Sequence, residues 1–400
     1  MPITATVILV AAVTVLLLLS PRIRNSRICQ ATVTPLASII GSGFLVVAPL
    51  LSYNFGDNAI WAMLLIIIVA YWVGNAVRFN IVHLEPLLAR PGQPPLLLHV
   101  ESLSRLVLAF AYVISVSFYL QLLPAFLLRG AGVHDGVVLK AVTTAFLGVI
   151  GLFGGLRGLH MLELLEDYAV SINLSIITAL FAGLVIFNID GETAAAATGQ
   201  PITFKNIQAL MGMLLIVQGF ETSRFLGVEY DADTRTRTMR YAQYLAGLIY
   251  IVFIILITPL AGFFHKLNET AIIDLSAHVS PVLPWLLILA ATMSQFSAAV
   301  ADTVSGGGLF AEASRSRYTN RAGYILVIGL SLVITWTTNI FEVISLASRA
   351  FALYYALQSA EALLVVFERR GEKHRRLKLI SYGGLALLMT AIVILGIPTG

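Results

Sequence analysis

Long apolar stretches recur along the whole chain, and each predicts a membrane-spanning helix. Their length is about 20 residues, which is what an α-helix needs to cross the hydrocarbon core of a bilayer. Strands of a membrane β-barrel would be about 10 residues long and would alternate apolar with polar residues, a pattern that is absent here. The predicted spans are twelve, at residues 4–20, 32–52, 59–79, 103–128, 138–156, 168–188, 206–228, 241–264, 283–303, 321–338, 341–367 and 378–396.

Glycine and polar residues interrupt two of these spans near their centres, at residues 41–43 and 218–221. Glycine permits non-helical backbone, which at membrane depth is tolerated only where it is buried in protein or lines a cavity. Interruptions in corresponding places of two halves are typical of the binding site of a secondary transporter. Alternatives stay open for both interruptions. The first, at residues 41–43, could be a face of small residues at which helices pack closely. In the second, Glu221 could form a structural ion pair with Arg224, or Arg224 could be a gate residue.

The loops between the spans divide into two groups by charge. Most of the Lys and Arg residues lie in alternate loops, including the basic run at residues 369–376, and the positive-inside rule makes these loops cytoplasmic. Both termini then lie outside. Only 12% of the residues are charged and 58% are hydrophobic, which excludes a soluble protein. Cys29 is the single cysteine, so an internal disulfide is impossible, and no Cys/His cluster has the spacing of a metal site.

The spans form two groups of five, the second to sixth and the seventh to eleventh. An odd number of spans in each group forces the two groups into opposite orientations, which is the inverted repeat of many transporters. The expected division is an extra N-terminal helix with a cytoplasmic loop at 1–30, a first repeat at 31–190, a second repeat at 191–368, and a basic loop with the last helix at 369–400.

The span at residues 283–303 is rich in small and hydroxylated residues. Ala291, Ser294, Ala298 and Ala301 fall on one helical stripe, which allows another helix to come close. Hydroxyl groups on that stripe could bind a hard cation, although serines in membrane helices more often bond to their own backbone. Elsewhere, Asp302 and Arg349 could form a gate pair or face separate vestibules.

At this point the motifs resemble known transporters. Ala291-x-x-Ser294 resembles the sodium-site helix of the sodium:solute symporters, and residues 37–43 resemble the first core helix of that family. The resemblance implies a sodium site made by the backbone carbonyls of Ala37 and Ile40 together with Ala291 and Ser294. Gln295 stands where that family has a second hydroxyl ligand, so either its amide oxygen substitutes or the site is damaged.

Two further segments extend the resemblance. Residues 154–158 are similar to the Gly-Gly-Leu-Arg stretch of the same family, which places Glu163 on the implied sodium exit path. Gly219-Phe220-Glu221 is similar to the sixth core helix of the amino acid–polyamine–organocation transporters. Both families have the leucine-transporter fold. The expected architecture is therefore an all-α polytopic membrane protein of that fold, a 5+5 inverted repeat with one extra helix at each end.

The leading hypothesis is ion-coupled symport of a small polar organic solute, such as an amino acid, by alternating access, with sodium favoured over protons. The bilayer is the other expected partner, with no nucleic acid and no obligate protein partner, in a plasma membrane of bacterial inner-membrane type. One alternative is a transporter-fold sensor or scaffold without transport. A polytopic membrane enzyme is another alternative, and the absence of a recognisable catalytic motif in the sequence argues against it. The expected substrate-binding residues are Gly41, Ser42, Gly43, Gln218, Gly219, Phe220 and Glu221.

Overall fold

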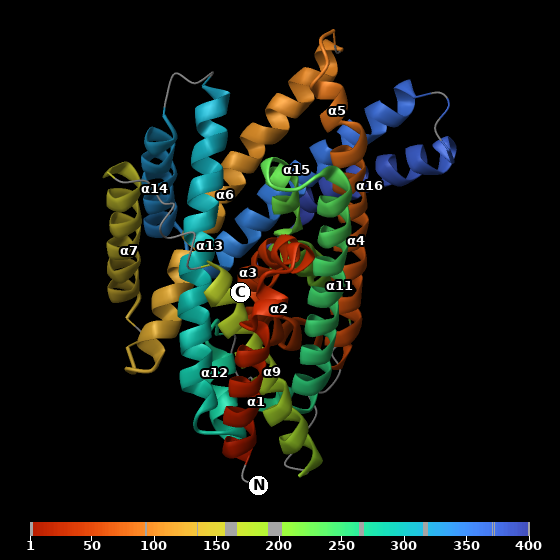
Figure 1. The fold of residues 1–400 in the computed structure, drawn as a ribbon. Helices are drawn as coiled ribbons and strands as arrows, with labels where there is room; N and C mark the ends of the chain where they lie inside the picture. Colours follow the sequence, from red (N-terminus) through yellow and green to blue (C-terminus); the bar gives the residue numbers. More distant parts are fainter. Residues whose placement is uncertain are drawn as a thin grey trace.

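The computed structural model describes residues 3–92, 94–133, 135–156, 166–190, 202–263, 268–314, 319–369, 371 and 373–398. This part of the chain contains helices and no strand. Most of the helices run along one common direction, α6 crosses the bundle obliquely, and α7 lies beside α14 at one edge (Figure 1). The expected all-helical, polytopic architecture is confirmed.

The described residues form a succession of α-helices and short 3-10 helices. They are α1 (Ile3–Leu18), α2 (Pro21–Arg24), α3 (Arg27–Phe55), η1 (Gly56–Asn58), α4 (Ala59–His83), α5 (Glu85–Leu88), α6 (Pro95–Arg129), α7 (Gly136–Leu156), α9 (Glu166–Ile189), α10 (Phe204–Met211), η2 (Leu214–Val217), η3 (Phe220–Val228), α11 (Ala232–Ile257), η4 (Thr258–Phe263), α12 (Ala271–Val279), α13 (Leu283–Ala313), α14 (Asn320–Thr337), α15 (Ile340–Glu368) and α16 (Arg375–Leu395).

The helices account for the twelve predicted spans. Within the described residues, nine apolar helical stretches are long enough to cross a membrane, and the longest of them, Arg27–Leu88, contains both α3 and α4. Helix α1, with 16 residues, and the interrupted segment of α10, η2 and η3 supply the other two. The short helix α12 lies in a stretch that the hydropathy pattern predicts as loop.

Local sequence signals explain where several helices begin. Thr203 and Asn339 each form a capping box with the residue three positions on, which satisfies backbone N–H groups at the helix start. Asp231 caps α11 by accepting a hydrogen bond from the Thr234 N–H, and that bond lowers the pKa of the Asp231 carboxyl. Pro95 opens α6, because a proline at the first helical position lacks only an N–H that would have no partner.

In four of the five counterpart pairs of the two groups, the helices pack against each other, and the fifth pair, α9 (Glu166–Ile189) and α15 (Ile340–Glu368), is not among the packed pairs of the described residues. Helix α3 contacts η2 and η3, α4 contacts α11, α6 contacts α13, and α7 contacts α14. This pairing is the one expected where a pseudo-two-fold axis relates two inverted repeats, because elements near such an axis meet their own symmetry mates. The arrangement places the interrupted segment beside α3 in the middle of the molecule.

Candidate functional site

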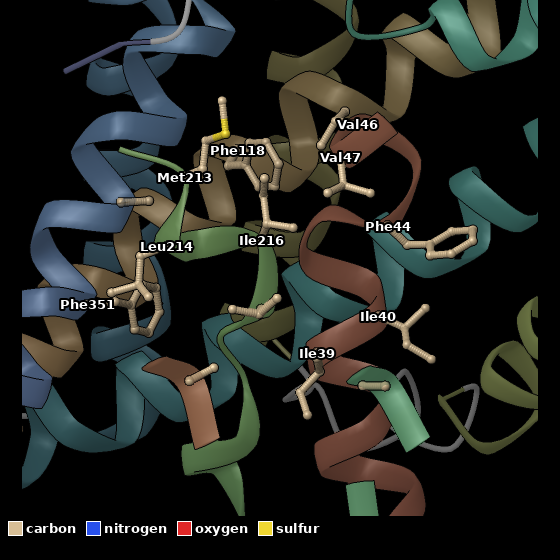
Figure 2. Close-up of a cluster of buried hydrophobic side chains, with 14 of the residues drawn as sticks. Ile39, Ile40, Phe44, Val46, Val47, Phe118, Met213, Leu214, Ile216 and Phe351 are labelled. Carbon is tan, nitrogen blue, oxygen red and sulfur yellow. The ribbon is translucent and has the colours of Figure 1, made fainter. Parts of the chain in front are cut away.

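The second interruption lies where the sequence predicts it. Helix α10 ends at Met211, and the chain passes through η2 and Gly219 into η3. Gly219 has a φ of +117°, and a Cβ atom there would lie 2.6 Å from the carbonyl carbon of Ser38 in α3. A residue with a side chain would fit neither the backbone conformation nor the space, so glycine is required here. Figure 2 shows the segment around Met213, Leu214 and Ile216 running beside the turns of α3 that carry Ile39 and Ile40.

The first interruption is not formed, which corrects the expectation of unwound backbone there. Helix α3 runs without a break from Arg27 to Phe55, through Gly41 and Gly43 and with Pro35 and Pro49 inside it. A Cβ atom on Gly43 would lie 2.8 Å from the Cα atom of Ile216. The glycine therefore makes room for the backbone of the second interruption, which is the packing alternative.

Tyr250 of α11 joins the two segments. Its hydroxyl group lies 3.0 Å from the carbonyl oxygen of Ile39 and 2.7 Å from that of Ile216, so its single proton is shared between the two carbonyls or donated to one of them. Tyr250 is fully buried, and a carbonyl outside a regular helix needs such a partner at this depth. The sequence contains no signal for this contact, because Tyr250 is one aromatic residue among many in an apolar span.

Glu221 stabilises the start of η3 rather than pairing with Arg224. Its Oε2 atom accepts hydrogen bonds from the Gly219 N–H at 2.9 Å and from the Tyr355 hydroxyl at 2.8 Å. The residue is fully buried, and its Oε1 atom has no hydrogen-bond partner in the described part of the chain. Phe220 stacks on the Tyr355 ring with centroids 5.3 Å apart. The carboxylate therefore holds one oxygen available beside an aromatic wall.

Gln218, just before Gly219 in the interruption, contacts another buried tyrosine. Its Nε2 atom donates to the Tyr119 hydroxyl of α6 at 3.2 Å, and the Gln218 side chain is buried. Residues 218–221 thus contact α6 and α15 as well as α3. The backbone of Ser42 lies in α3, and its side chain lies outside the described structure.

Arg224 binds acidic residues from other elements. Its Nη2 atom lies 3.0 Å from Glu101 of α6, its Nη1 atom 3.7 Å from Glu361 of α15, and its Nε atom 3.7 Å from Glu85 of α5. Glu361 is fully buried and Glu101 is 5% exposed. The sequence analysis does not predict that Glu101 is buried in a helix, because the proline-rich stretch before it predicts a loop that ends near residue 103.

Two more arginines extend this ionic cluster. Arg235 of α11 lies 2.7 Å from Glu85 and donates to the Arg224 carbonyl at 2.9 Å. Arg105 bridges Glu101 at 2.7 Å and Glu312 of α13 at 2.8 Å. A cavity of about 340 Å³ opens against the cluster on the side predicted to be cytoplasmic. The cluster therefore ties α5, α6, η3, α11, α13 and α15 together at one end of the bundle.

Three of the five predicted ion-site residues line a small cavity between α3, α9 and α13. Its volume is about 20 Å³, enough for one water molecule or a small ion. Ala37, Ile40 and Ser294 line it, together with Asn173 and Ser297. Asn173 donates to the Ser294 hydroxyl across 3.5 Å. The cavity thus brings hydroxyl and amide groups from α9 and α13 to the side of α3.

Two residues of the predicted ion site lie beside this cavity rather than on it. Ala291 is buried but is not among the residues that line it. The Nε2 atom of Gln295 donates to the carbonyl of Gly41 at 3.1 Å, and its Oε1 atom has no partner in the described structure. Gln295 therefore secures α13 to α3 in this conformation.

Among the described residues, Asp302 and Arg349, the other predicted gate residues, lie apart from the Arg224 cluster. Asp302 is buried in α13. Arg349 is exposed, and its Nε atom donates to the Val393 carbonyl of α16 at 2.6 Å, so the expected pair with Asp302 is not formed. Glu163 lies outside the described residues. Of the predicted gating residues, only Arg224 takes part in an ion-pair cluster in the described structure.

Comparisons with known proteins identify the family. A family model described as APC superfamily transporter matches residues 21–396. A protein of Aquifex aeolicus (strain VF5), described only as uncharacterized, is 44% identical over 388 residues, which are 95% of this chain and 94% of that protein. Neither match singles out the sodium:solute symporters, so that finer resemblance stays a prediction. The family model covers nearly the whole chain, and the protein therefore belongs to the APC superfamily of transporters.

Proposed function

We propose that this protein is an ion-coupled secondary symporter that moves a small polar organic solute by alternating access, with sodium as the favoured ion. One observation supports the proposal: a cavity large enough for one water molecule or a small ion lies between α3, α9 and α13, and Ser38, which lines it, packs against Gly219 of the interruption. An ion at that position would hold together elements that have to separate for the site to change sides. Such an ion favours one conformational state through its differential affinity.

The side chains around the cavity suit a hard cation in part. Ser294, Ser297 and Asn173 offer oxygen atoms, the ligands that such cations prefer. The carbonyls of Ala37 and Ile40 lie on a continuous helix, where each already serves as an acceptor within the helix. Their participation requires α3 to open at residues 41–43, and the glycines there lower the cost of that change.

The solute would bind between α3 and the interrupted segment, against Gln218, Gly219, Phe220 and Glu221. The buried Oε1 atom of Glu221 supports a solute with an ammonium group, such as an amino acid, because a buried carboxylate oxygen without a partner is costly. The same atom favours a second candidate, proton coupling through Glu221. A scaffold or sensor without transport would need neither arrangement.

A thermal stability measurement on the purified protein tests sodium binding. We expect sodium chloride, but not choline chloride, to raise the melting temperature, since a ligand that binds only the folded state stabilises it by about 2.7 kcal/mol at 100 times its Kd. Ser294→Ala should abolish the effect. Thr390→Ala is the matched control, because Thr390 is exposed on α16 and bonds only within its own helix.

Uptake into proteoliposomes then separates the candidates. A solute found in a stability screen should accumulate with an inward sodium gradient. Accumulation that follows a proton gradient and is lost in Glu221→Gln would move the coupling to Glu221. Uptake that is indifferent to both gradients would refute ion coupling altogether, and we would then favour the scaffold or sensor.

The orientation belongs to the same proposal. We propose that both termini lie outside, that the membrane is a bacterial inner membrane, and that residues 31–190 and 191–368 are the two inverted repeats. The support is the distribution of basic residues among the loops and the packing of counterpart helices.

A further inference from the structure

A crevice between α4 and α11 faces the membrane. Its volume is about 420 Å³, and its wall is largely apolar, with Ile67, Ile68, Gly247, Leu248 and Ile251 among the residues that line it. Ile68 and Leu248 are 61% and 59% exposed, so the mouth of the crevice opens to lipid rather than to another helix. The space and its lining suit an acyl chain.

A buried cation lies at one end of this crevice. Arg78 of α4 is 4% exposed and contacts Gln243 and Tyr71, both of which line the crevice. No carboxylate pairs with Arg78 among the described residues, whereas Arg224 and Arg235, equally buried, both have one. A buried charge without a partner is costly, and a guanidinium at membrane depth ordinarily has an anion nearby.

A second cation and an aromatic pair complete the end of the crevice. Arg240 of α11 is exposed, lies close enough to Arg78 to interact with it electrostatically, and forms no ion pair with a described carboxylate. Tyr71 and Tyr244 stack with centroids 5.2 Å apart, and their hydroxyl groups are 2.8 Å apart. The Arg78 guanidinium lies over the Tyr71 ring, 4.8 Å from its centroid, so this cation and the aromatic pair are neighbours at the same end of the crevice.

The crevice therefore has cations and tyrosine rings together at one end and an apolar wall along the rest. Basic residues at the level of lipid headgroups attract anionic lipids, and tyrosine rings favour the interface. We propose that the crevice between α4 and α11 binds an anionic phospholipid of the predicted cytoplasmic leaflet, with its phosphate at Arg78 and Arg240 and an acyl chain along the apolar wall. Ile39 of α3 and Val217 of η2 also line the crevice, so a bound acyl chain would contact both α3 and the interrupted segment.

Retention of lipid by the purified protein tests the cationic end. Delipidated protein is titrated with phosphatidylglycerol or phosphatidylcholine in mixed micelles, and bound lipid is counted by native mass spectrometry. We expect phosphatidylglycerol to bind more tightly, and Arg240→Gln or Arg78→Gln to weaken its binding by about fivefold for each cation. Arg237→Gln is the matched control, because Arg237 lies on the same helix and is already paired with Asp233 at 3.0 Å.

Equal binding of the two lipids, or unchanged binding in both arginine variants, would overturn the proposal. If Arg78→Gln fails to fold, the exposed Arg240 decides the result by itself. The apolar wall has its own test: Ile251→Trp narrows the crevice and should reduce retention, while Ile255→Trp, one turn along and outside the lining, should not. Soluble glycerol phosphate that competed fully with the lipid would show that the acyl chain contributes nothing, which also contradicts the proposal.

Discussion

At Gly219 the backbone conformation and the space both exclude a side chain. The φ of +117° is one that residues with a Cβ rarely adopt, and that atom would meet the backbone of Ser38. We expect Gly219→Ala to lower the stability of the purified protein by about 1–3 kcal/mol from the backbone conformation alone, with the clash adding to it. Thermal unfolding in detergent measures the effect.

Gly308→Ala is the matched control for that prediction. Gly308 lies inside α13, and a Cβ atom there would have no neighbour within 4 Å. An alanine should leave the protein unchanged or stabilise it, because glycine costs about 0.5–1 kcal/mol in a helix interior. If both variants lose the same stability, the special role of Gly219 is wrong.

The sequence shows that a glycine is present but not what it is for. Gly219 and Gly43 belong to similar patterns, yet one adopts a positive φ and the other stays helical and admits a neighbouring backbone. The difference depends on which segment packs against each glycine, and no local pattern contains that information. Glu221 shows the same limit, since its partner Tyr355 is distant along the chain.

Between elements, the ionic cluster around Arg224 provides a separate test. Removing one member of a buried pair leaves a charge without a partner and costs about 3–5 kcal/mol. We expect Arg224→Gln and Glu101→Gln to be individually destabilising, and the double variant to lose much less than the sum of the two. The coupling free energy from a double-mutant cycle, measured by unfolding, is the readout.

Arg237 and Asp233 provide the comparison for this cycle. They form an ion pair on α11 at 3.0 Å, with side chains 53% and 79% exposed, so solvent screens their attraction. Their coupling should be close to zero. A comparably small coupling between Arg224 and Glu101 would mean that the cluster does not hold η3 to α6.

The helices themselves were largely predictable, because apolar length determines a membrane span almost regardless of its partners. The span predicted at 283–303 is too short, since α13 continues to Ala313 through the three consecutive glycines at 306–308. Glu101 was likewise assigned to a loop, although it lies in α6. Hydropathy reports how apolar a segment is, so it does not show that a helix continues beyond its apolar part.

At the scale of the whole molecule, the proposed membrane topology depends on two independent properties, the packing of the helices and their orientation in the membrane. The packing of counterpart helices is observed in the described structure. The orientation in the membrane is inferred from the basic residues in the loops. A membrane protein of this packing could lie either way up. Only the charge distribution chooses between the two orientations, so the orientation needs its own experiment.

Cysteine labelling in intact cells decides the orientation. Cys29 is the single cysteine and is replaced by serine, after which one exposed position at a time receives a new cysteine. Ala131→Cys, between α6 and α7, and Pro398→Cys, after α16, should react with a membrane-impermeant maleimide. Gly371→Cys, beside the basic run before α16, should react only after the cells are permeabilised. The reverse result would turn the molecule over and place the Arg224 cluster and the proposed lipid site in the outer half of the membrane. Because the packing is the same either way up, that result would leave the inverted repeat intact and would contradict only the charge argument.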